Sequence, residues 1–194
     1  MNPSVASWRR QQRTAYLTKR AAVTPAERKA AVSAIAEKLD RLAAELASTV
    51  IGIYWPIRNE LNLIQWASAL ARRSGVTLCL PVVVEPNTPL EYWRWQPGDP
   101  MRAGIWNIPT PARRDVQSPD LVLAPLVAFD TENFRLGYGG GYFDRTLAGR
   151  TPKPFAVGIG YDFCGLETIF PQPHDVPMNA ILTERRKILR SARE

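Results

Sequence analysis

A short glycine-rich segment carries the residue types best suited to phosphate chemistry. From Arg135 to Arg145 the sequence reads RLGYGGGYFDR, with four glycines within five positions. Glycines let a backbone come close to a ligand and turn its N–H groups toward it. Arg135 and Arg145 are candidate phosphate ligands, and Asp144 offers a carboxylate oxygen of the kind that Mg²⁺ prefers. The segment therefore indicates a site for phosphate and a divalent cation.

Two common phosphate-binding motifs do not match this segment. A Walker A loop has Lys and then Ser or Thr after its last glycine, whereas Tyr142 and Phe143 follow Gly141 here. The dinucleotide-binding fingerprint needs a third glycine where Tyr142 stands. The segment alone leaves two interpretations open: a phosphate-binding loop, or a tight strand-to-helix turn that needs glycine only for its shape.

A strand and a helix are predicted to hold the segment in place. Residues 121–124 form an apolar run ended by Pro125, which predicts a buried strand. A helix is predicted from about Tyr142. Its N-terminus would add the positive end of a helix dipole beside a bound anion.

The rest of the chain reads as alternating helices and strands, which predicts an α/β fold with parallel strand pairs. The capping signals Thr24-Pro25-Ala26-Glu27, Asn62 and Gly75 mark helix ends. We predict helices over 4–22, from Pro25 to about Ala47, and over 63–74. We predict further strands over 50–55, 76–80, 90–95, 155–160 and 180–182. Pro81 is expected to stop the strand over 76–80, and the strand over 90–95 lies within an otherwise irregular Pro-rich stretch from 81 to 119. No linker divides the chain, so residues 1–194 are expected to form a single domain.

Composition narrows the class of protein. Apolar residues make up 45% of the 194 residues, which is enough for a packed core. No apolar run reaches about 18 residues, so no membrane-spanning helix is expected. The first residues lack the apolar stretch of a secretion signal. Cys79 and Cys164 lie far apart without C-x-x-C neighbours, which favours two buried thiols in a reducing cytoplasm over a disulfide or a zinc site.

The formal net charge of +7 would attract polyanions. The positive side chains are mostly arginines scattered among acids, and the densest group is Arg185, Arg186, Lys187 and Arg190. We interpret this group as a solvated tail and expect no nucleic-acid or membrane partner. A basic polyanion-binding module is kept as an alternative function.

Five runs of sequence resemble the 5-formyltetrahydrofolate cyclo-ligase (methenyltetrahydrofolate synthetase) family. RLGYGGGYFDR is similar to the family's signature, and DLVLAPLVAF at 120–129 is similar to the strand before it. An early strand of the family with its Glu resembles YWPIRNELN at 54–62, and its Trp-containing substrate loop resembles GIWNIP at 104–109. Its C-terminal acid and last strand resemble PHDVPMNAILT at 173–183. Their order and spacing agree with the family over nearly the whole chain.

The resemblance implies a fold and a reaction. The fold would be a three-layer α/β sandwich with a mostly parallel sheet, similar to sugar-phosphate isomerases and CoA-transferases. The enzyme would use ATP and Mg²⁺ to convert 5-formyltetrahydrofolate to 5,10-methenyltetrahydrofolate, releasing ADP and phosphate. The implied route phosphorylates the formyl oxygen, after which a neighbouring folate amine attacks the activated carbon. Such an enzyme would act on small molecules, and we expect a monomer.

The resemblance also implies roles for single residues. Asp144 and Asp175 match the magnesium ligands. Glu60 and Trp106 match residues that contact the folate, and Tyr54 and Pro81 are expected to line the same pocket. No protein nucleophile is implied, and no catalytic residue is assigned. The implied ATP-binding residues are Arg9, Arg13, Arg135, Gly137, Tyr138, Gly139, Gly140, Gly141, Tyr142, Phe143 and Arg145.

Four positions depart from residues that occur in the family: Arg9 stands where Lys is usual, and Gly140 stands where some members carry Lys. Phe143 replaces a frequent Tyr, and Cys164 lies about where a Gln is common. The departures at Phe143 and Cys164 keep a further alternative open: an ATP-dependent enzyme on the same fold that acts on another amide or carboxylate.

Overall fold

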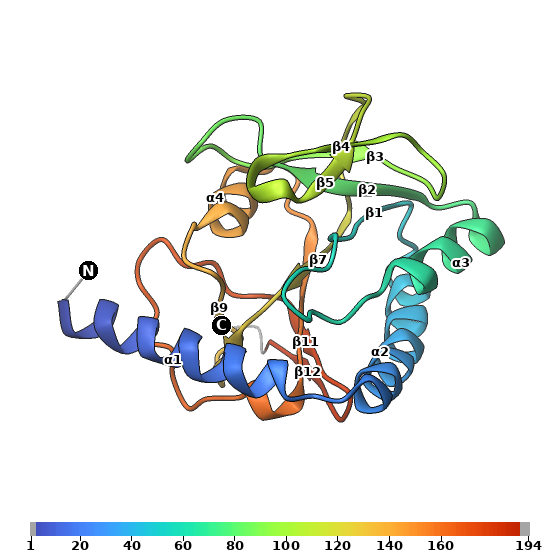
Figure 1. Cartoon of the computed structure of the whole chain (residues 1–194). Helices are drawn as coiled ribbons and strands as arrows, with labels where there is room; N and C mark the ends of the chain where they lie inside the picture. The colour runs from blue at the N-terminus through green and yellow to red at the C-terminus, as the bar shows by residue number, and fades with distance from the viewer. Residues whose placement is uncertain (1–2, 191–194) are drawn as a thin grey trace.

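A mixed eight-stranded sheet forms the centre of the fold (Figure 1). The computed structural model describes residues 3–190. The strand order is β12-β11-β10-β7-β1-β2-β3-β6. Five neighbouring strands are parallel: β11 (Ala180–Leu182), β10 (Phe155–Ile159), β7 (Leu121–Pro125), β1 (Val50–Gly52) and β2 (Thr77–Val82). Antiparallel strands extend the two edges: β12 (Lys187–Leu189) on one side, and β3 (Glu91–Arg94) and β6 (Val116–Gln117) on the other.

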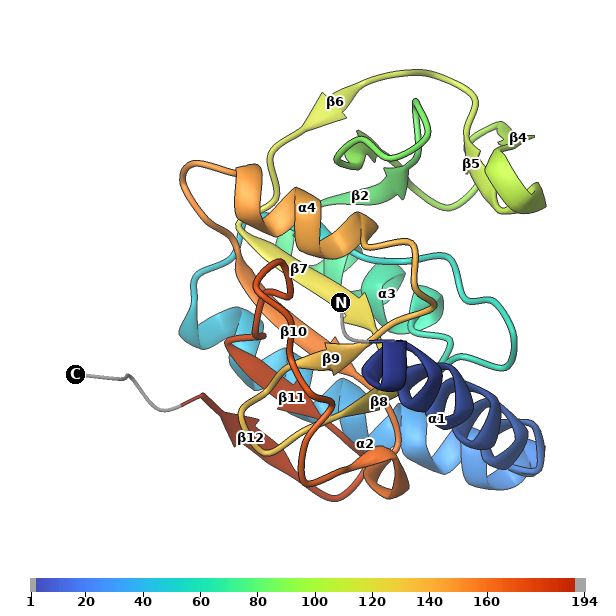
Figure 2. The same cartoon turned by 90° about the vertical axis from the view of Figure 1, so that its left-hand side faces the viewer.

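Helices cover both faces of the sheet and make three layers. Figures 1 and 2 show α1 (Pro3–Ala21) and α4 (Tyr142–Gly149) on one face, and α2 (Pro25–Glu45) and α3 (Ile64–Ser74) on the other. Strands buried on both sides read as continuous apolar runs, which is why β7 and β10 were recognisable in the sequence. Leu121, Leu123, Val157 and Ile181 are fully buried between the helical layers. The predicted three-layer α/β class is confirmed.

Local signals set the ends of two helices as the sequence predicted. The Thr24 hydroxyl accepts the Glu27 N–H at 3.2 Å, and the Glu27 carboxylate accepts the Thr24 N–H at 2.8 Å, which completes a capping box before α2. At the start of α3, Asn62 Oδ1 accepts the Ile64 N–H at 3.0 Å. Gly75 ends α3 in the left-handed region, with φ 73°.

Several predicted element bounds were wrong. The strand expected over 50–55 ends at Gly52, although the Ile53 N–H still donates to the Cys79 carbonyl at 3.0 Å. Pro81 does not stop β2, which continues to Val82. The ladder between β1 and β2 ends at Cys79, so the missing N–H of Pro81 breaks no bond on that side.

Two stretches read as irregular contain regular structure. In the region 81–119 the strand predicted over 90–95 is confirmed as β3, and the region also holds β6, a hairpin of β4 (Met101–Ala103) with β5 (Pro109–Pro111), and the short helix η1 (Ile105–Asn107). The basic group near the C-terminus is not simply a solvated tail, because Lys187–Leu189 is strand β12. A second hairpin joins β8 (Ala128–Phe129) to β9 (Arg135–Leu136), and η2 (Asp162–Cys164) follows β10.

Both cysteines are free and buried, as the sequence suggested. Burial raises the pKa of the Cys79 and Cys164 thiols to about 12 in each case, so neither is a reactive thiolate near neutral pH. Within residues 3–190, no helix combines the length and apolar character needed to cross a bilayer.

Candidate functional site

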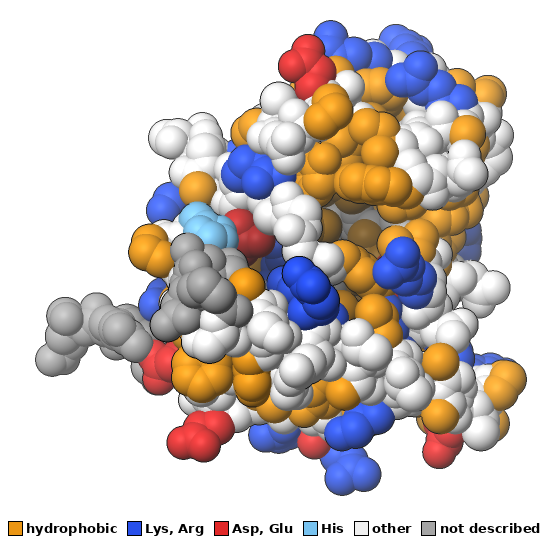
Figure 3. Space-filling model, turned by 60° about the vertical axis from the view of Figure 1, so that its left-hand side comes forward, with side chains coloured by type: hydrophobic (Ala, Val, Ile, Leu, Met, Phe, Trp, Pro, Cys, Tyr) orange, Lys and Arg blue, Asp and Glu red, His pale blue; other side chains and the backbone are white. Residues whose placement is uncertain are grey.

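A cavity of about 580 Å³ lies at the carboxyl ends of three central parallel strands. Tyr54 follows β1, Val83 follows β2, and Pro125 ends β7, and all three line the cavity. In open α/β sheets this is the edge where ligands bind. Figure 3 shows the hollow with hydrophobic side chains inside it and Lys or Arg side chains near its rim.

The glycine-rich loop runs from β9 to α4 and forms one wall of this cavity. Gly141 is the N-cap of α4 and has φ 64°, a left-handed conformation that L-residues with side chains rarely adopt. At Gly137 a Cβ atom would lie 2.5 Å from Arg135 Nη1, so a side chain there would displace that guanidinium. The Gly137 carbonyl accepts Arg13 Nε at 2.7 Å, which ties the loop to α1.

Asp144 points into the cavity from the first turn of α4 and is paired with Arg135. Arg135 Nη2 lies 3.0 Å from Asp144 Oδ2, and both side chains are largely buried. The other oxygen, Asp144 Oδ1, accepts the Val176 N–H at 3.2 Å. The Arg135 guanidinium also lies 4.9 Å from the Phe143 ring centroid. This cluster fixes Asp144 next to the segment that carries Asp175.

Asp175 reaches the same cavity from a turn before β11. Its carboxylate lies 3.0 Å from Arg9 Nη2 of α1 and accepts the Gln172 N–H at 2.7 Å. Arg13 lies one turn further along α1, and its pKa is lowered by burial and by the neighbouring charge of Arg9. Four arginines and three carboxylates line the cavity, so its wall is positive by one charge when His174 is neutral.

The arrangement suits a divalent cation only if other ligands help to hold it. Within residues 3–190, no cluster of three or more His, Cys, Asp or Glu side chains could hold a metal. Asp144 and Asp175 are two carboxylates that line one cavity, and guanidinium groups compensate both. Two carboxylates supplemented by substrate phosphates and water are a common environment for Mg²⁺.

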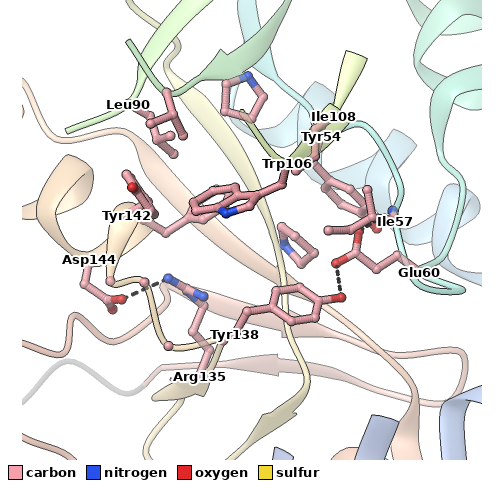
Figure 4. A pocket seen from close by; sticks show the side chains of 18 of the residues that line it. Tyr54, Ile57, Glu60, Leu90, Trp106, Ile108, Arg135, Tyr138, Tyr142 and Asp144 are labelled. Atoms are coloured by element: carbon pink, nitrogen blue, oxygen red, sulfur yellow. Dashed lines mark hydrogen bonds and ion pairs between the residues drawn. The ribbon is translucent and has the colours of Figure 1, made fainter. Parts of the chain in front are cut away.

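Glu60 is buried at the opposite end of the cavity, with 5% of its surface exposed. Its Oε1 accepts the Tyr138 hydroxyl at 2.8 Å, and its Oε2 accepts the Ile57 N–H at 2.9 Å (Figure 4). Burial raises the pKa of Glu60, and these two donors oppose the shift. The nearby Tyr54 hydroxyl donates to the Leu61 carbonyl at 2.7 Å. Glu60 is thus an acceptor held in a fixed orientation.

Trp106 extends over the cavity and is unusually accessible for its size. It is 66% exposed, and its backbone lies in the left-handed region at φ 56°. Its indole ring lies edge-on to the Tyr142 ring, with centroids 5.6 Å apart (Figure 4). A large exposed aromatic ring beside a cavity offers a flat apolar surface to a planar ligand.

The structure brings all but one of the predicted site residues to this cavity. The exception is Arg145, whose Nη2 donates to the Gly140 carbonyl and whose guanidinium lies 5.0 Å from the Tyr142 ring centroid. Arg145 therefore holds the loop from outside the cavity wall. The residues brought together are Arg9, Arg13, Tyr54, Glu60, Pro81, Trp106, Arg135, Gly137, Tyr138, Gly139, Gly140, Gly141, Tyr142, Phe143, Asp144 and Asp175.

Sequence reasoning missed other residues of the site. Arg58 lines the cavity, with its guanidinium 5.3 Å from the Tyr138 ring centroid, and no motif marked it. Arg20 contacts Tyr138 from the buried side. Its place eleven residues after Arg9, close to three helical turns, puts it on the same stripe of α1 and could have pointed to it.

Comparison with known proteins agrees with this geometry. A sequence model described as the 5-formyltetrahydrofolate cyclo-ligase family matches residues 5–184. The chain is 29% identical over 187 residues to a 5-formyltetrahydrofolate cyclo-ligase of Mycolicibacterium smegmatis, covering 92% of this chain and 95% of the relative. It is 30% identical over 186 residues to the protein of the same name from Haemophilus influenzae, covering 90% and 96%.

Two solved structures share the fold. The NMR structure of a 5,10-methenyltetrahydrofolate synthetase from Aquifex aeolicus is similar with a TM-score of 0.80 at 28% identity, covering 96% of this chain and 95% of that one. The structure of a 5,10-methenyltetrahydrofolate synthetase from Mycoplasma pneumoniae is similar with a TM-score of 0.75 at 24% identity, covering 91% and 98%.

Proposed function

The chain belongs to the 5-formyltetrahydrofolate cyclo-ligase family, and we propose that it uses ATP and Mg²⁺ to convert 5-formyltetrahydrofolate to 5,10-methenyltetrahydrofolate, releasing ADP and phosphate. One observation carries the proposal. A single cavity joins a glycine-rich loop, arginines and two aspartates at one end to Glu60 at the other, with the Trp106 ring between them and 5.6 Å from the Tyr142 ring. A polyphosphate and a pterin ring could therefore meet in it.

The triphosphate binds at the end formed by the glycine-rich loop and α1. Gly137, Gly139, Gly140 and Gly141 form a wall without side chains that a polyphosphate can approach closely. Arg9, Arg13 and Arg135 supply the positive charge, and the buried Nε atoms of Arg9 and Arg135 have no hydrogen-bond partner among residues 3–190. Arg145 supports the loop through the Gly140 carbonyl.

Asp144 and Asp175 hold the Mg²⁺ in this proposal. Both are carboxylates that line the phosphate end and pair with arginines, and carboxylate oxygens are ligands that a hard cation prefers. Bound Mg²⁺ would neutralise charge on the phosphoryl group in transfer. Arg9 and Arg135 already hold the two carboxylates in place before substrates arrive.

The folate binds at the other end. Glu60 accepts hydrogen bonds from the 2-amino-4-oxo edge of the pterin, because an ionised carboxylate is an acceptor only. Trp106 packs against the ring system, and Tyr54 and Pro81 complete the apolar wall. The formyl group then lies between the pterin and the glycine-rich loop.

Positioning supplies most of the catalysis. The formyl oxygen takes the γ-phosphoryl group of ATP, and ADP leaves. The neighbouring folate amine then forms a bond to the activated carbon and loses its proton, and phosphate leaves with the former formyl oxygen. This route forms no bond to a protein side chain, so binding has to hold the two substrates in the reactive geometry.

The two alternative functions have less support. A polyanion-binding module would need a free basic surface, yet Arg186 pairs with Asp162 at 2.6 Å and Lys187 pairs with Glu45 at 2.9 Å. The second alternative, an enzyme for another amide, depends partly on the departure at Cys164. That residue is buried outside the cavity lining, so it does not alter the substrate pocket directly. We also propose that residues 1–194 act as one domain, as a monomer, in the cytoplasm.

Turnover in the presence and absence of each component tests the proposal. The protein with 5-formyltetrahydrofolate, ATP and Mg²⁺ should form the strongly absorbing methenyl product and release one ADP for each product molecule. Omission of ATP, or removal of Mg²⁺ with a chelator, should stop product formation. No product at saturating ATP and folate would reject the proposal, and ADP release with an unrelated amide alone would favour the other enzyme.

A further inference from the structure

Arg20 is a buried cation at the C-terminal end of α1, with 4% of its surface exposed. It does not line the cavity. We infer that Arg20 is a positioning residue, which holds the Tyr138 hydroxyl against Glu60 and so keeps the Glu60 carboxylate available to the folate. This inference rests on the proposed function, in which Glu60 binds the pterin edge.

The contacts of Arg20 direct it toward Tyr138. Its Nη1 donates to the Leu126 carbonyl at 3.3 Å, and its Nη2 donates to the Tyr138 hydroxyl. Its guanidinium also lies 5.7 Å from the Tyr138 ring centroid. No carboxylate among residues 3–190 forms an ion pair with Arg20. A buried guanidinium without an acid in contact is costly unless a nearby anion compensates it, and Glu60 lies just beyond the hydroxyl.

Donor and acceptor rules fix the direction of this chain of contacts. A guanidinium has only donors, so the Tyr138 oxygen must accept from Arg20. The single hydroxyl proton is then left for Glu60 Oε1, 2.8 Å away. The result is an ordered series of hydrogen bonds from Arg20 through Tyr138 to Glu60. Arg20 orients the Tyr138 hydroxyl, and the hydroxyl donates its proton to the Glu60 carboxylate.

The series links the two ends of the cavity. Tyr138 belongs to the glycine-rich loop, whereas Glu60 follows β1 at the folate end. Arg20 lies on the same helix as Arg9 and Arg13, which reach the phosphate end. One helix therefore positions groups at both substrate sites.

Glu60 should titrate differently without Arg20. Burial raises the pKa of Glu60, while the Ile57 N–H, the Tyr138 hydroxyl, Arg20 and Arg58 lower it. The pKa of Tyr54, the other titratable neighbour, is raised well above its usual value by burial and by the Glu60 charge, so Tyr54 stays neutral. Loss of Arg20 removes one stabiliser of the carboxylate. The pKa of Glu60 would then be higher. Because the folate needs the ionised carboxylate, acidification would abolish folate binding at a higher pH than in the wild type.

The test measures binding of 5-formyltetrahydrofolate alone, by quenching of tryptophan fluorescence across the acid pH range. We expect Arg20→Met to weaken binding roughly tenfold at neutral pH, the effect of one charged hydrogen bond. The acid limb of its folate-binding curve, the pH range in which binding is lost on acidification, should move to higher pH. The KM for ATP should stay within about twofold of the wild-type value. Arg20→Lys, which keeps the charge, should recover part of the shift. Arg10→Met removes the same charge from an exposed position of α1 and should match the wild type.

Tyr138→Phe keeps Arg20 and the aromatic ring but removes the hydroxyl, so it tests the inference even if Arg20→Met folds poorly. It should weaken folate binding similarly, and the double variant should be no worse than the weaker-binding single variant. Additive losses, or an unchanged acid limb in Tyr138→Phe, would overturn the role of Arg20. Wild-type protein that does not bind the folate at all would instead reject the proposed function.

Discussion

Asp144 connects three parts of the site, because it belongs to α4, pairs with Arg135 and accepts the Val176 N–H. We predict that Asp144→Asn lowers Mg²⁺-dependent turnover roughly 10²-fold or more, since a neutral amide no longer compensates a cation beside the phosphates. The amide oxygen can still accept the Val176 N–H, so circular dichroism and cooperative unfolding should show a folded protein. Unchanged turnover in a folded variant would refute the metal assignment.

Trp106 offers a second test at the level of a single residue. Because it is 66% exposed, Trp106→Ala should leave the free energy of unfolding nearly unchanged. We expect the KM for 5-formyltetrahydrofolate to rise about tenfold through the loss of aromatic contact, with little change in the KM for ATP.

Trp106→Phe is the matched control, because it keeps a flat ring and should retain most of the affinity. The two KM values, measured with the other substrate saturating, decide the outcome. A rise in the KM for ATP alone would mean that the Trp106 indole contacts ATP and not the folate.

Residues of the site differed in how far the sequence could reveal them. Asp144 and the glycines stand in one short run, so their spacing predicted a joint site, although the run alone also fitted a purely structural turn. Asp175 and Glu60 are isolated acids, and only the family resemblance singled them out. Arg20 is an arginine on a basic helix, and nothing local separates a buried guanidinium from a solvated one. Its role depends on Tyr138, which is 118 residues away in the chain.

At the scale of elements, the turn between β9 and α4 depends on left-handed glycine. Gly141→Ala would force a side chain into φ 64° and place a Cβ atom 2.9 Å from Arg145 Nη1. We predict a loss of stability of about 1–2 kcal/mol. We also predict a larger relative loss of ATP affinity than of folate affinity, since the loop and not Glu60 is displaced.

Gly149→Ala in the same helix provides the control. A Cβ atom at Gly149 meets nothing within 4 Å, and Gly149 is the last residue of α4. Alanine there should be neutral or slightly stabilising. Urea unfolding and KM measurements on both variants give the comparison. Equal behaviour of the two variants would mean that the loop tolerates a side chain at position 141.

The elements themselves were predictable where one local signal was strong. The capping box fixed α2, and fully apolar runs fixed β7 and β10 because both faces of those strands are covered. The edge strands β6 and β12 were missed, since β12 has only three residues, two of them exposed, and depends on pairing with β11. The strands β4 and β5 likewise depend on pairing with each other, and neither has a sequence that predicts a strand by itself.

At the scale of the whole molecule, the cavity is built from distant parts of the chain. Its walls come from α1, the segment after β1, the stretch around η1, the glycine-rich loop and the turn before β11. A ligand that contacts all of these holds the layers together and binds only the folded state. Binding free energy then adds to the free energy of unfolding by mass action.

We therefore predict that ligands raise the melting temperature. At about 100 times its Kd, one ligand should add about 2.7 kcal/mol, which corresponds to roughly 5–10 °C for a chain of this size. ATP with Mg²⁺ and 5-formyltetrahydrofolate should each cause a shift. ATP with a chelator should cause a smaller one, because the cation would no longer link the triphosphate to Asp144 and Asp175.

Asp144→Asn separates the two ligands in the same measurement. It should lose most of the extra shift from Mg²⁺ while keeping the shift from the folate, because Glu60 lies at the other end of the cavity. If the folate shift vanished as well, the two ends would not act as separate subsites. If ATP gave no shift at any concentration, the nucleotide would not bind this cavity, and Arg9 and Arg13 of α1 would serve only to hold Asp175 and the glycine-rich loop.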